Sequence, residues 1–213
     1  MTETSAPKIR YDLSIIESWI KPGSKVLGLG CGDGDLLYAL KTKKNVAERG
    51  VERSEKKAAV CLSKGLSVVQ GDIYDEIEDY PDKFFDYVIL SQTMQEVFQP
   101  YDLLIEMLRI GKQVIVSFPN FGYWRIRLQL LLTGRAPVTE HLPYTWYSTP
   151  NIRVLTLNDF RQFSRDVGFS ISKEININTH SQDMSGKTIN VLPNLRSTYG
   201  VYMIQEAGNN GKK

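Results

Sequence analysis

The stretch Val26-Leu-Gly-Leu-Gly-Cys-Gly-Asp-Gly-Asp35 carries the main information on fold class in this sequence. The apolar run Lys25–Leu29 is typical of a buried strand, and the leucines at 36, 37 and 40 have the spacing of a helix. In doubly wound sheets, the turn between the first strand and the first helix borders the crevice where ligands bind. Because glycine adopts positive φ and lets a ligand reach the main chain, this turn predicts a binding site.

The spacing of the glycines separates two kinds of ligand. A dinucleotide-binding loop has the pattern Gly-x-Gly-x-x-Gly, but the sixth position is Asp33 counted from Gly28 and Asp35 counted from Gly30. The pattern that fits is Gly-x-Gly-x-Gly, ending at Gly34, which resembles the first motif of S-adenosylmethionine (SAM)-dependent methyltransferases. A glycine-rich turn that binds nothing is the alternative.

Two carboxylates follow the next two predicted strands. Glu52 ends the strand predicted over Ala47–Glu52, about 20 residues after the glycines, where a carboxylate can accept both ribose hydroxyls of a nucleoside. Asp72 follows the strand predicted over Leu66–Gln70, and the resemblance implies that this acid meets the adenine amino group. Either acid alone is more simply a helix cap or a solvated charge. Their joint occurrence at two strand ends favours a nucleoside site.

Predicted strands and helices alternate along most of the chain. This predicts an α/β fold with a doubly wound, mostly parallel seven-stranded sheet of the Rossmann-like class, whose last two strands make an antiparallel end. Residues 119–155 interrupt the alternation after the fifth strand, and we expect an insertion, a helix plus a loop, over the open edge of the site. We expect a single domain over residues 1–206 and a disordered tail over 207–213.

The composition argues against several classes of protein. Hydrophobic residues make up 42% of the chain, and the net charge of +2 gives no field that would attract nucleic acid. No apolar run reaches the roughly 20 residues of a transmembrane helix, and the first residues do not resemble a signal peptide, so we expect a cytoplasmic protein without membrane contact. Cys31 and Cys61 have no zinc-ligand spacing, so we expect no metal.

Several long and unusual segments identify a closer family. They are Leu29-Gly-Cys-Gly-Asp-Gly34, Val69-Gln-Gly-Asp72, Phe85-Asp-Tyr-Val-Ile-Leu-Ser-Gln-Thr93, Val116-Ser-Phe-Pro-Asn-Phe-Gly122, Trp124-Arg-Ile-Arg-Leu-Gln-Leu-Leu-Leu132, Leu142-Pro-Tyr-Thr-Trp-Tyr147 and Thr149-Pro-Asn-Ile152. Through them the chain resembles the methionine biosynthesis protein MetW family over about residues 10 to 175.

This resemblance has implications for the cofactor and the partner. It implies a class I methyltransferase fold that binds SAM or S-adenosylhomocysteine (SAH), and a role in methionine biosynthesis beside a homoserine O-acyltransferase. The cofactor-binding residues expected from the motifs are Gly30, Cys31, Gly32, Gly34, Glu52, Asp72, Ile73 and Ser91. One position departs from the general motif: Gly28 stands where an acid usually helps to hold the methionine ammonium group. Its absence is expected to weaken binding by about 1–3 kcal/mol.

The sequence offers few catalytic groups. Gln92 follows the fourth predicted strand and Asn120 the fifth, so both are expected to face the crevice and to position a substrate, while His141 is the one plausible general base. Two functions therefore stay open: a non-catalytic or weakly catalytic partner of the acyltransferase, and an active SAM-dependent methyltransferase acting on a small molecule. The aromatic and arginine side chains of the insertion fit a protein-binding surface or a packed lid equally well.

Overall fold

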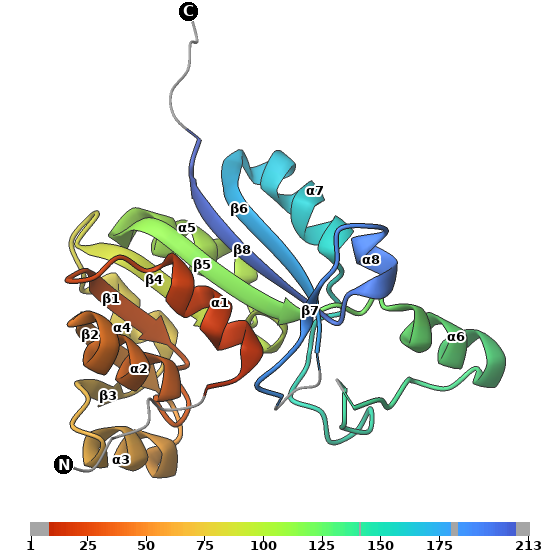
Figure 1. Cartoon of the computed structure of the whole chain (residues 1–213), viewed down its shortest axis with the longest axis horizontal. Coiled ribbons are helices and arrows are strands. Elements are labelled where there is room, and N and C mark those ends of the chain that lie inside the picture. Colours follow the sequence, from red (N-terminus) through yellow and green to blue (C-terminus); the bar gives the residue numbers. More distant parts are fainter. Residues whose placement is uncertain (1–8, 141, 180–182, 208–213) are drawn as a thin grey trace, which may run out of the picture.

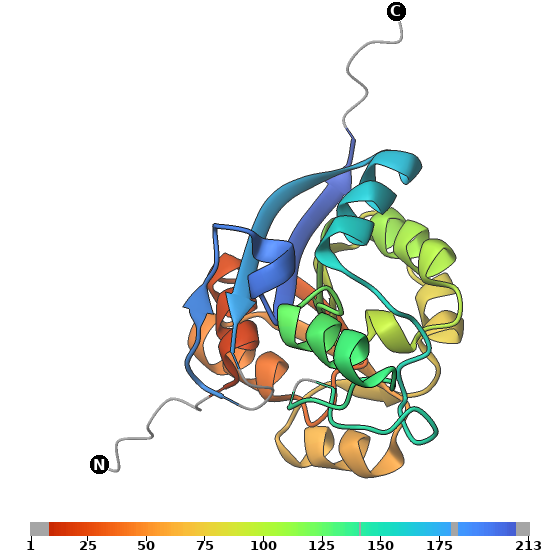
Figure 2. The same ribbon diagram turned by 90° about the vertical axis from the view of Figure 1, so that its right-hand side faces the viewer.

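The computed structural model describes residues 9–140, 142–179 and 183–207. Its centre is one eight-stranded sheet in the order β3-β2-β1-β4-β5-β8-β6-β7, with helices on both faces (Figures 1 and 2). The strands are β1 Lys25–Leu29, β2 Ala47–Glu52, β3 Val68–Gln70, β4 Phe85–Ser91, β5 Gly111–Pro119, β6 Phe169–Asn178, β7 Lys187–Thr188 and β8 Tyr199–Glu206.

The first five strands are parallel and the last three are antiparallel to their neighbours. β1 pairs in parallel with β2 and β4, and β4 pairs in parallel with β5. β8 then runs antiparallel between β5 and β6. The carboxyl ends of β1 to β5 consequently meet along one edge of the sheet.

Helices cover both faces of the sheet and bury its apolar side chains. Adjacent residues of β1 point to opposite faces: Val26 packs in a cluster with side chains of α1, α2 and α3, whereas Leu27 packs in a cluster with side chains of α4, α5 and α7. The helices are α1 Tyr11–Trp19, α2 Asp35–Lys44, α3 Glu55–Ser63, α4 Ile73–Glu78, η1 Met94–Glu96, α5 Pro100–Ile110, α6 Trp124–Thr133, α7 Leu157–Val167 and α8 Pro193–Arg196.

The predicted doubly wound, mostly parallel sheet is confirmed, with one correction. The sequence predicts seven strands, and the structure has eight because Lys187–Thr188 pairs with the end of β6. A two-residue edge strand is too short to show the alternation on which strand prediction depends. The same limit applies to the short helices α4 and α8, which the periodicity also does not predict.

The segment between β5 and α7 contains α6, which projects from the body of the molecule (Figure 1). Ile126 is its one buried residue, and it forms a small cluster with Tyr123 and with Leu142 of the following loop. We still predict that residues 1–206, including this insertion, form a single domain. His141 and residues 208–213 lie outside the described residues. None of the described helices is long and apolar enough to cross a membrane.

Candidate functional site

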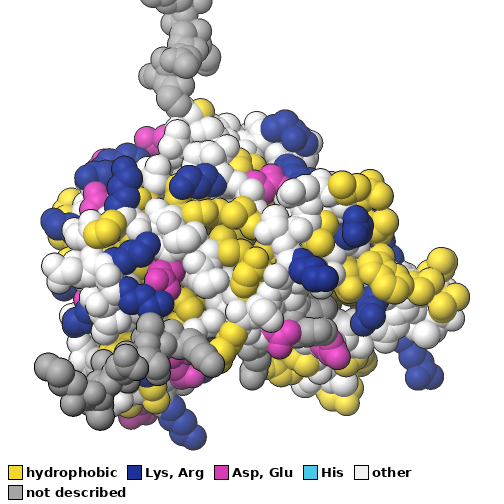
Figure 3. Space-filling view, in the orientation of Figure 1, with side chains coloured by type: hydrophobic (Ala, Val, Ile, Leu, Met, Phe, Trp, Pro, Cys, Tyr) yellow, Lys and Arg dark blue, Asp and Glu magenta, His cyan; other side chains and the backbone are white. Residues whose placement is uncertain are grey.

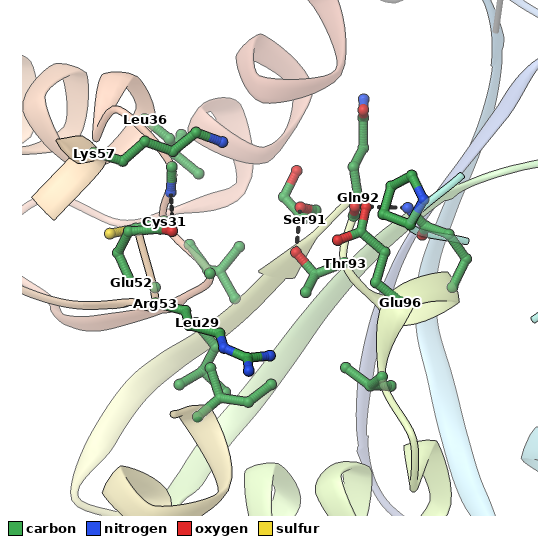
Figure 4. Close-up of a pocket in the computed structure, with 18 of the residues that line it drawn as sticks. Leu29, Cys31, Leu36, Glu52, Arg53, Lys57, Ser91, Gln92, Thr93 and Glu96 are labelled. Atoms are coloured by element: carbon green, nitrogen blue, oxygen red, sulfur yellow. Dashed lines mark hydrogen bonds between the residues drawn. The ribbon is translucent and has the colours of Figure 1, made fainter. Parts of the chain in front are cut away.

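A cavity of about 900 Å³ opens at the carboxyl ends of β1, β2 and β4. Figure 4 shows Glu52, Arg53 and Lys57 on one side of this space. Ser91, Thr93 and Glu96 lie on the other side, at and beyond the end of β4. The volume is within the range of small-molecule sites, roughly 300–1,000 Å³. Its charged lining residues are five acids and three bases, namely Asp33, Asp35, Glu52, Asp72, Glu96, Arg10, Arg53 and Lys57.

The glycine loop forms the floor of the cavity in a backbone conformation that favours glycine. Gly30, Gly32 and Gly34 have φ of 61°, 59° and 76°, and Gly34 is the N-cap of α2. A Cβ on Gly32 would meet no atom within 4 Å, whereas one on Gly34 would lie 2.5 Å from Leu66 Cδ1. The loop therefore presents bare main chain at Gly32 and packs tightly against the body at Gly34.

The buried Glu52 carboxylate ties this loop to the end of β2. Its Oε2 accepts a hydrogen bond from the Gly32 N–H at 2.8 Å, and its Oε1 accepts one from the Ser54 N–H at 2.9 Å. Each carboxylate oxygen can accept a further hydrogen bond. Glu52 can consequently hold the loop in shape and still accept the hydroxyls of a ribose.

Asp72 follows the end of β3, the strand next to β2 in the sheet. Glu52 pairs in register with Gln70, which places the two carboxylates along the same edge of the sheet. Asp72 Oδ1 accepts a hydrogen bond from the Tyr74 N–H at 3.0 Å and so caps α4. The other carboxylate oxygen is left for a ligand, and both Asp72 and Ile73 line the cavity.

The end of β4 contributes Ser91 and Gln92. Ser91 Oγ lies 2.9 Å from Ser117 Oγ on β5, and Gln92 has a left-handed φ of 53°. The Gln92 amide donates to the buried Asp12 carboxylate at 2.8 Å. Gln92 lines the cavity, but its amide is engaged in holding α1 against the end of β4.

Arg10, the N-cap residue of α1, lines the cavity. The sequence does not predict this role for Arg10. Its Nε and Nη2 each donate to Asp12 at 3.1 Å, and within the described chain its Nη1 makes no hydrogen bond. A guanidinium held in this way suits a carboxylate. The first helix carries no motif, and only the fold brings its beginning to the cavity that the glycine loop also lines.

At Gly28 the structure explains the departure from the general motif. A Cβ there would lie 3.3 and 3.4 Å from the two methyl groups of Leu37. These contacts are tight, so an acid at this position would require Leu37 to shift. The wall of the cavity is apolar here, with Leu37 beside Gly28.

The expectation that Asn120 faces the crevice is wrong. Its side chain is buried and does not line the cavity. Its amide nitrogen donates to Asn194 O and Ser197 O, and its Oδ1 accepts from Gly122 N and Leu157 N. Both ends of the Asn120 amide are therefore engaged within the protein, and they join the end of β5 to α7 and α8. His141, the predicted base, falls outside the described residues.

Glu96 is a carboxylate of the cavity that the sequence does not identify. It lies in η1, one turn beyond β4, opposite Lys57 and Glu52 (Figure 4). Burial raises its pKa, and the charge of Glu52 raises it further while that of Lys57 opposes the shift. Glu96 is therefore a candidate proton acceptor among the described residues of the cavity. In the same part of the chain no cluster of His, Cys, Asp or Glu could hold a metal ion.

Cys31 of the glycine loop and the buried Cys61 of α3 are neighbours. Burial raises the pKa of the Cys31 thiol, and the adjacent Cys61 and the charge of Glu52 raise it further. Burial also raises the pKa of the Cys61 thiol, whose Sγ donates to Gly32 O at 3.2 Å. Both groups are consequently protonated and unreactive at neutral pH.

We expect alkylation by iodoacetamide at about pH 8 to modify both cysteines in urea and neither in the folded protein.

The raised pKa of Cys31 also predicts a pH dependence of stability. The Cys31 thiol of the unfolded chain ionises near the ordinary cysteine pKa of 9.0, whereas the folded thiol keeps its proton. Since alkaline pH then favours the unfolded chain, the free energy of unfolding should fall between about pH 8 and about pH 10. Urea titrations at both pH values measure this slope, and Cys31→Ala should reduce it. An equal slope in the variant would contradict the assignment.

The strand order, the glycine loop and the two carboxylates define the class I SAM-dependent methyltransferase fold. The chain is similar to a possible histamine N-methyltransferase from Thermotoga maritima, with a TM-score of 0.66 and 21% identity, over 92% of this chain and 88% of that one. It is also similar to a magnesium protoporphyrin IX methyltransferase with bound SAH from Synechocystis PCC 6803, with a TM-score of 0.61 and 16% identity, over 92% and 82% of the two chains. These likenesses establish the fold.

The chain belongs to the methionine biosynthesis protein MetW family, whose family model matches residues 10–204. It is 35% identical over 171 residues to the bifunctional methionine biosynthesis protein MetXA/MetW of Rhodopirellula baltica. That match covers 76% of this chain and 27% of the relative. The chain thus spans about a quarter of the length of this curated relative.

Proposed function

We propose that this protein binds SAM or SAH in the cavity and acts with, or regulates, a homoserine O-acyltransferase of methionine biosynthesis. The observation that supports the cofactor assignment is the Glu52 carboxylate, which accepts a hydrogen bond from the bare glycine loop and lines the cavity together with Asp72. The family resemblance implies the partner. The bifunctional relative supports a physical association, because its MetXA and MetW parts share one polypeptide.

The residues of the cavity fit an adenosyl amino acid. Asp72 has a carboxylate oxygen for the adenine amino group, Glu52 can accept the ribose hydroxyls, and Arg10 Nη1 can bind the carboxylate. The excess of acids over bases around the cavity favours a ligand with a positive charge, which the SAM sulfonium supplies. Because SAM is made from methionine, its binding here would report the pathway's end product to the acyltransferase.

A catalytic methyltransferase acting on a small molecule is the second candidate. It is favoured by Glu96, whose raised pKa suits a group that takes a proton from a substrate at the mouth of the cavity. SAM supplies the methyl group in such a reaction. Transfer of radiolabelled methyl groups from SAM into a small-molecule extract supports this candidate, and an inert extract with a SAM-saturated protein rejects it.

Calorimetry with SAH tests the cofactor assignment, and we expect saturable binding. Asp72→Asn should weaken it about tenfold: the Asn carbonyl still caps α4 at Tyr74 N, but its NH₂ group then faces the adenine amino group. Asp75→Asn is the matched control, since Asp75 is an exposed acid of the same helix outside the cavity. Absence of SAH and SAM binding by the wild-type protein would reject the assignment.

A further inference from the structure

The insertion exposes an unusual amount of apolar surface. Leu131 and Leu132 of α6 are 81% and 73% exposed, and Trp146 and Tyr147 of the following loop are 76% and 74% exposed. A ten-residue helix with one buried side chain is not stable alone, so α6 depends on its small contact with Leu142. We call the following residues the insertion surface: Leu128, Leu130, Leu131, Leu132, Tyr144, Trp146, Tyr147, Ile152 and Val154.

The charges around the insertion surface are almost all positive. Residues 119–155 contain four arginines, at positions 125, 127, 135 and 153, and one acid, Glu140. Figure 3 shows apolar side chains gathered on the projecting part, with basic side chains beside them. Arg125 stacks on the Trp124 ring, 5.4 Å from its centroid. A complementary partner has an apolar face with an acidic rim.

The loop that carries part of the insertion surface is also a wall of the cavity. Pro143, Tyr144, Pro150 and Asn151 line the cavity, and the outward-facing Trp146 and Tyr147 lie between them in the sequence. A ligand in the cavity and a protein on the surface therefore contact the same short loop.

Hydrogen bonds fasten this loop to the segment beyond β4. The backbone N–H groups of Ile152 and Arg153 donate to Gln95 O at 2.9 and 3.0 Å, and the Arg153 guanidinium donates to Phe98 O. Gln95 and Phe98 both line the cavity. A shift of this segment on ligand binding is consequently transmitted to Ile152, which belongs to the insertion surface.

The fused relative supports one choice of partner for this surface. The matched region is 27% of that relative, and the rest of the same polypeptide holds its MetXA part, so the two parts meet at high effective concentration. We propose that the insertion surface is the docking site of the homoserine O-acyltransferase. This proposal rests on the proposed function, which names the acyltransferase as the partner. We include in this proposal that docking and cofactor binding influence each other through residues 143–153.

The docking site is tested with purified homoserine O-acyltransferase from the same organism and the full-length chain. Leu131→Glu should raise the dissociation constant at least about tenfold, because it replaces an apolar side chain that is 81% exposed on this surface with an acid. Leu62→Glu is the matched control: Leu62 is 58% exposed on α3, at the opposite end of the molecule in Figure 1. Trp146→Ala is a second variant, which removes an exposed aromatic side chain of the insertion surface from the loop after α6 and should also weaken acyltransferase binding.

Three results separate the hypotheses. If the wild-type protein does not bind the acyltransferase, the partner role in the proposed function fails. If it binds and Leu131→Glu and Trp146→Ala bind equally well, the proposed function stands and the docking site is wrong. If light scattering shows that Leu131→Glu alters self-association while acyltransferase binding is unchanged, the surface joins two copies of this chain and the proposal is overturned.

The link to the cofactor site is measured by repeating the titration with saturating SAH. We expect the dissociation constant of the acyltransferase to change at least about threefold. The dissociation constant of SAH should change by the same factor when the acyltransferase is bound, because coupling is reciprocal. Equal constants with and without SAH would overturn the coupling.

Discussion

Gly34→Ala is expected to lower the free energy of unfolding by about 2–4 kcal/mol and to abolish SAH binding. Two costs add here: an alanine in the left-handed region, and a Cβ placed 2.5 Å from Leu66 Cδ1 and 2.8 Å from Cys61 Sγ. Relief requires the loop to move away from α3. That movement separates Gly32 N from Glu52 Oε2, whose bond sets the shape of the site.

The control for this prediction is Gly65→Ala. Gly65 has a similar φ of 71°, but a Cβ there would meet no atom within 4 Å, so we expect a loss of about 1–2 kcal/mol and unchanged SAH binding. Urea denaturation of both variants and calorimetry with SAH measure the two effects. Equal losses of stability in the two variants would show that packing around Gly34 is not tight.

The sequence predicts the part of the site that local patterns encode. The glycine loop follows an apolar strand, and Glu52 and Asp72 each end or follow a strand in the same parallel set. Because the carboxyl ends of parallel strands share one edge, strand position alone brings these groups together. The two-residue strand β7 and the four-residue helix α8 escape prediction because each spans only about one period of its pattern, which is too short for a repeat to show.

Residues that depend on tertiary packing could not be predicted in this way. Arg10 enters the cavity because Asp12 bonds to Gln92 across 80 residues of sequence. Asn120 follows a strand in the same manner as Gln92, yet its amide is turned into the body, where backbone groups near α7 and α8 require partners. Position after a strand fixes the edge of the sheet but not the direction of a side chain.

Under the proposed function, Glu52 connects the stability of the loop with the binding of the cofactor. Gly30 and Gly32 both have left-handed φ, and the Glu52 carboxylate supplies a fixed acceptor for the Gly32 N–H. Since the same carboxylate is expected to accept ribose hydroxyls, cofactor binding and loop geometry depend on one group. A change that removes one acceptor oxygen should therefore affect both properties.

Glu52→Gln is expected to weaken SAH binding about ten- to a hundredfold while the protein stays folded. One oxygen becomes an NH₂ group, which then faces the N–H of Gly32 or of Ser54 and also loses a ribose hydroxyl. Loss of the one ribose hydrogen bond to a charged acceptor corresponds to about 1.5–3 kcal/mol of binding energy, and the unpaired backbone donor costs about 1–3 kcal/mol of stability.

Calorimetry with SAH and urea denaturation separate these two effects of Glu52→Gln. Glu55→Gln is the matched control, because Glu55 is an exposed acid in the first turn of α3 and does not line the cavity. It should leave both SAH affinity and stability within about 0.5 kcal/mol of the wild-type values. Wild-type SAH affinity in Glu52→Gln, with the expected loss of stability, would mean that Glu52 only shapes the loop and that the ribose lies elsewhere in the cavity.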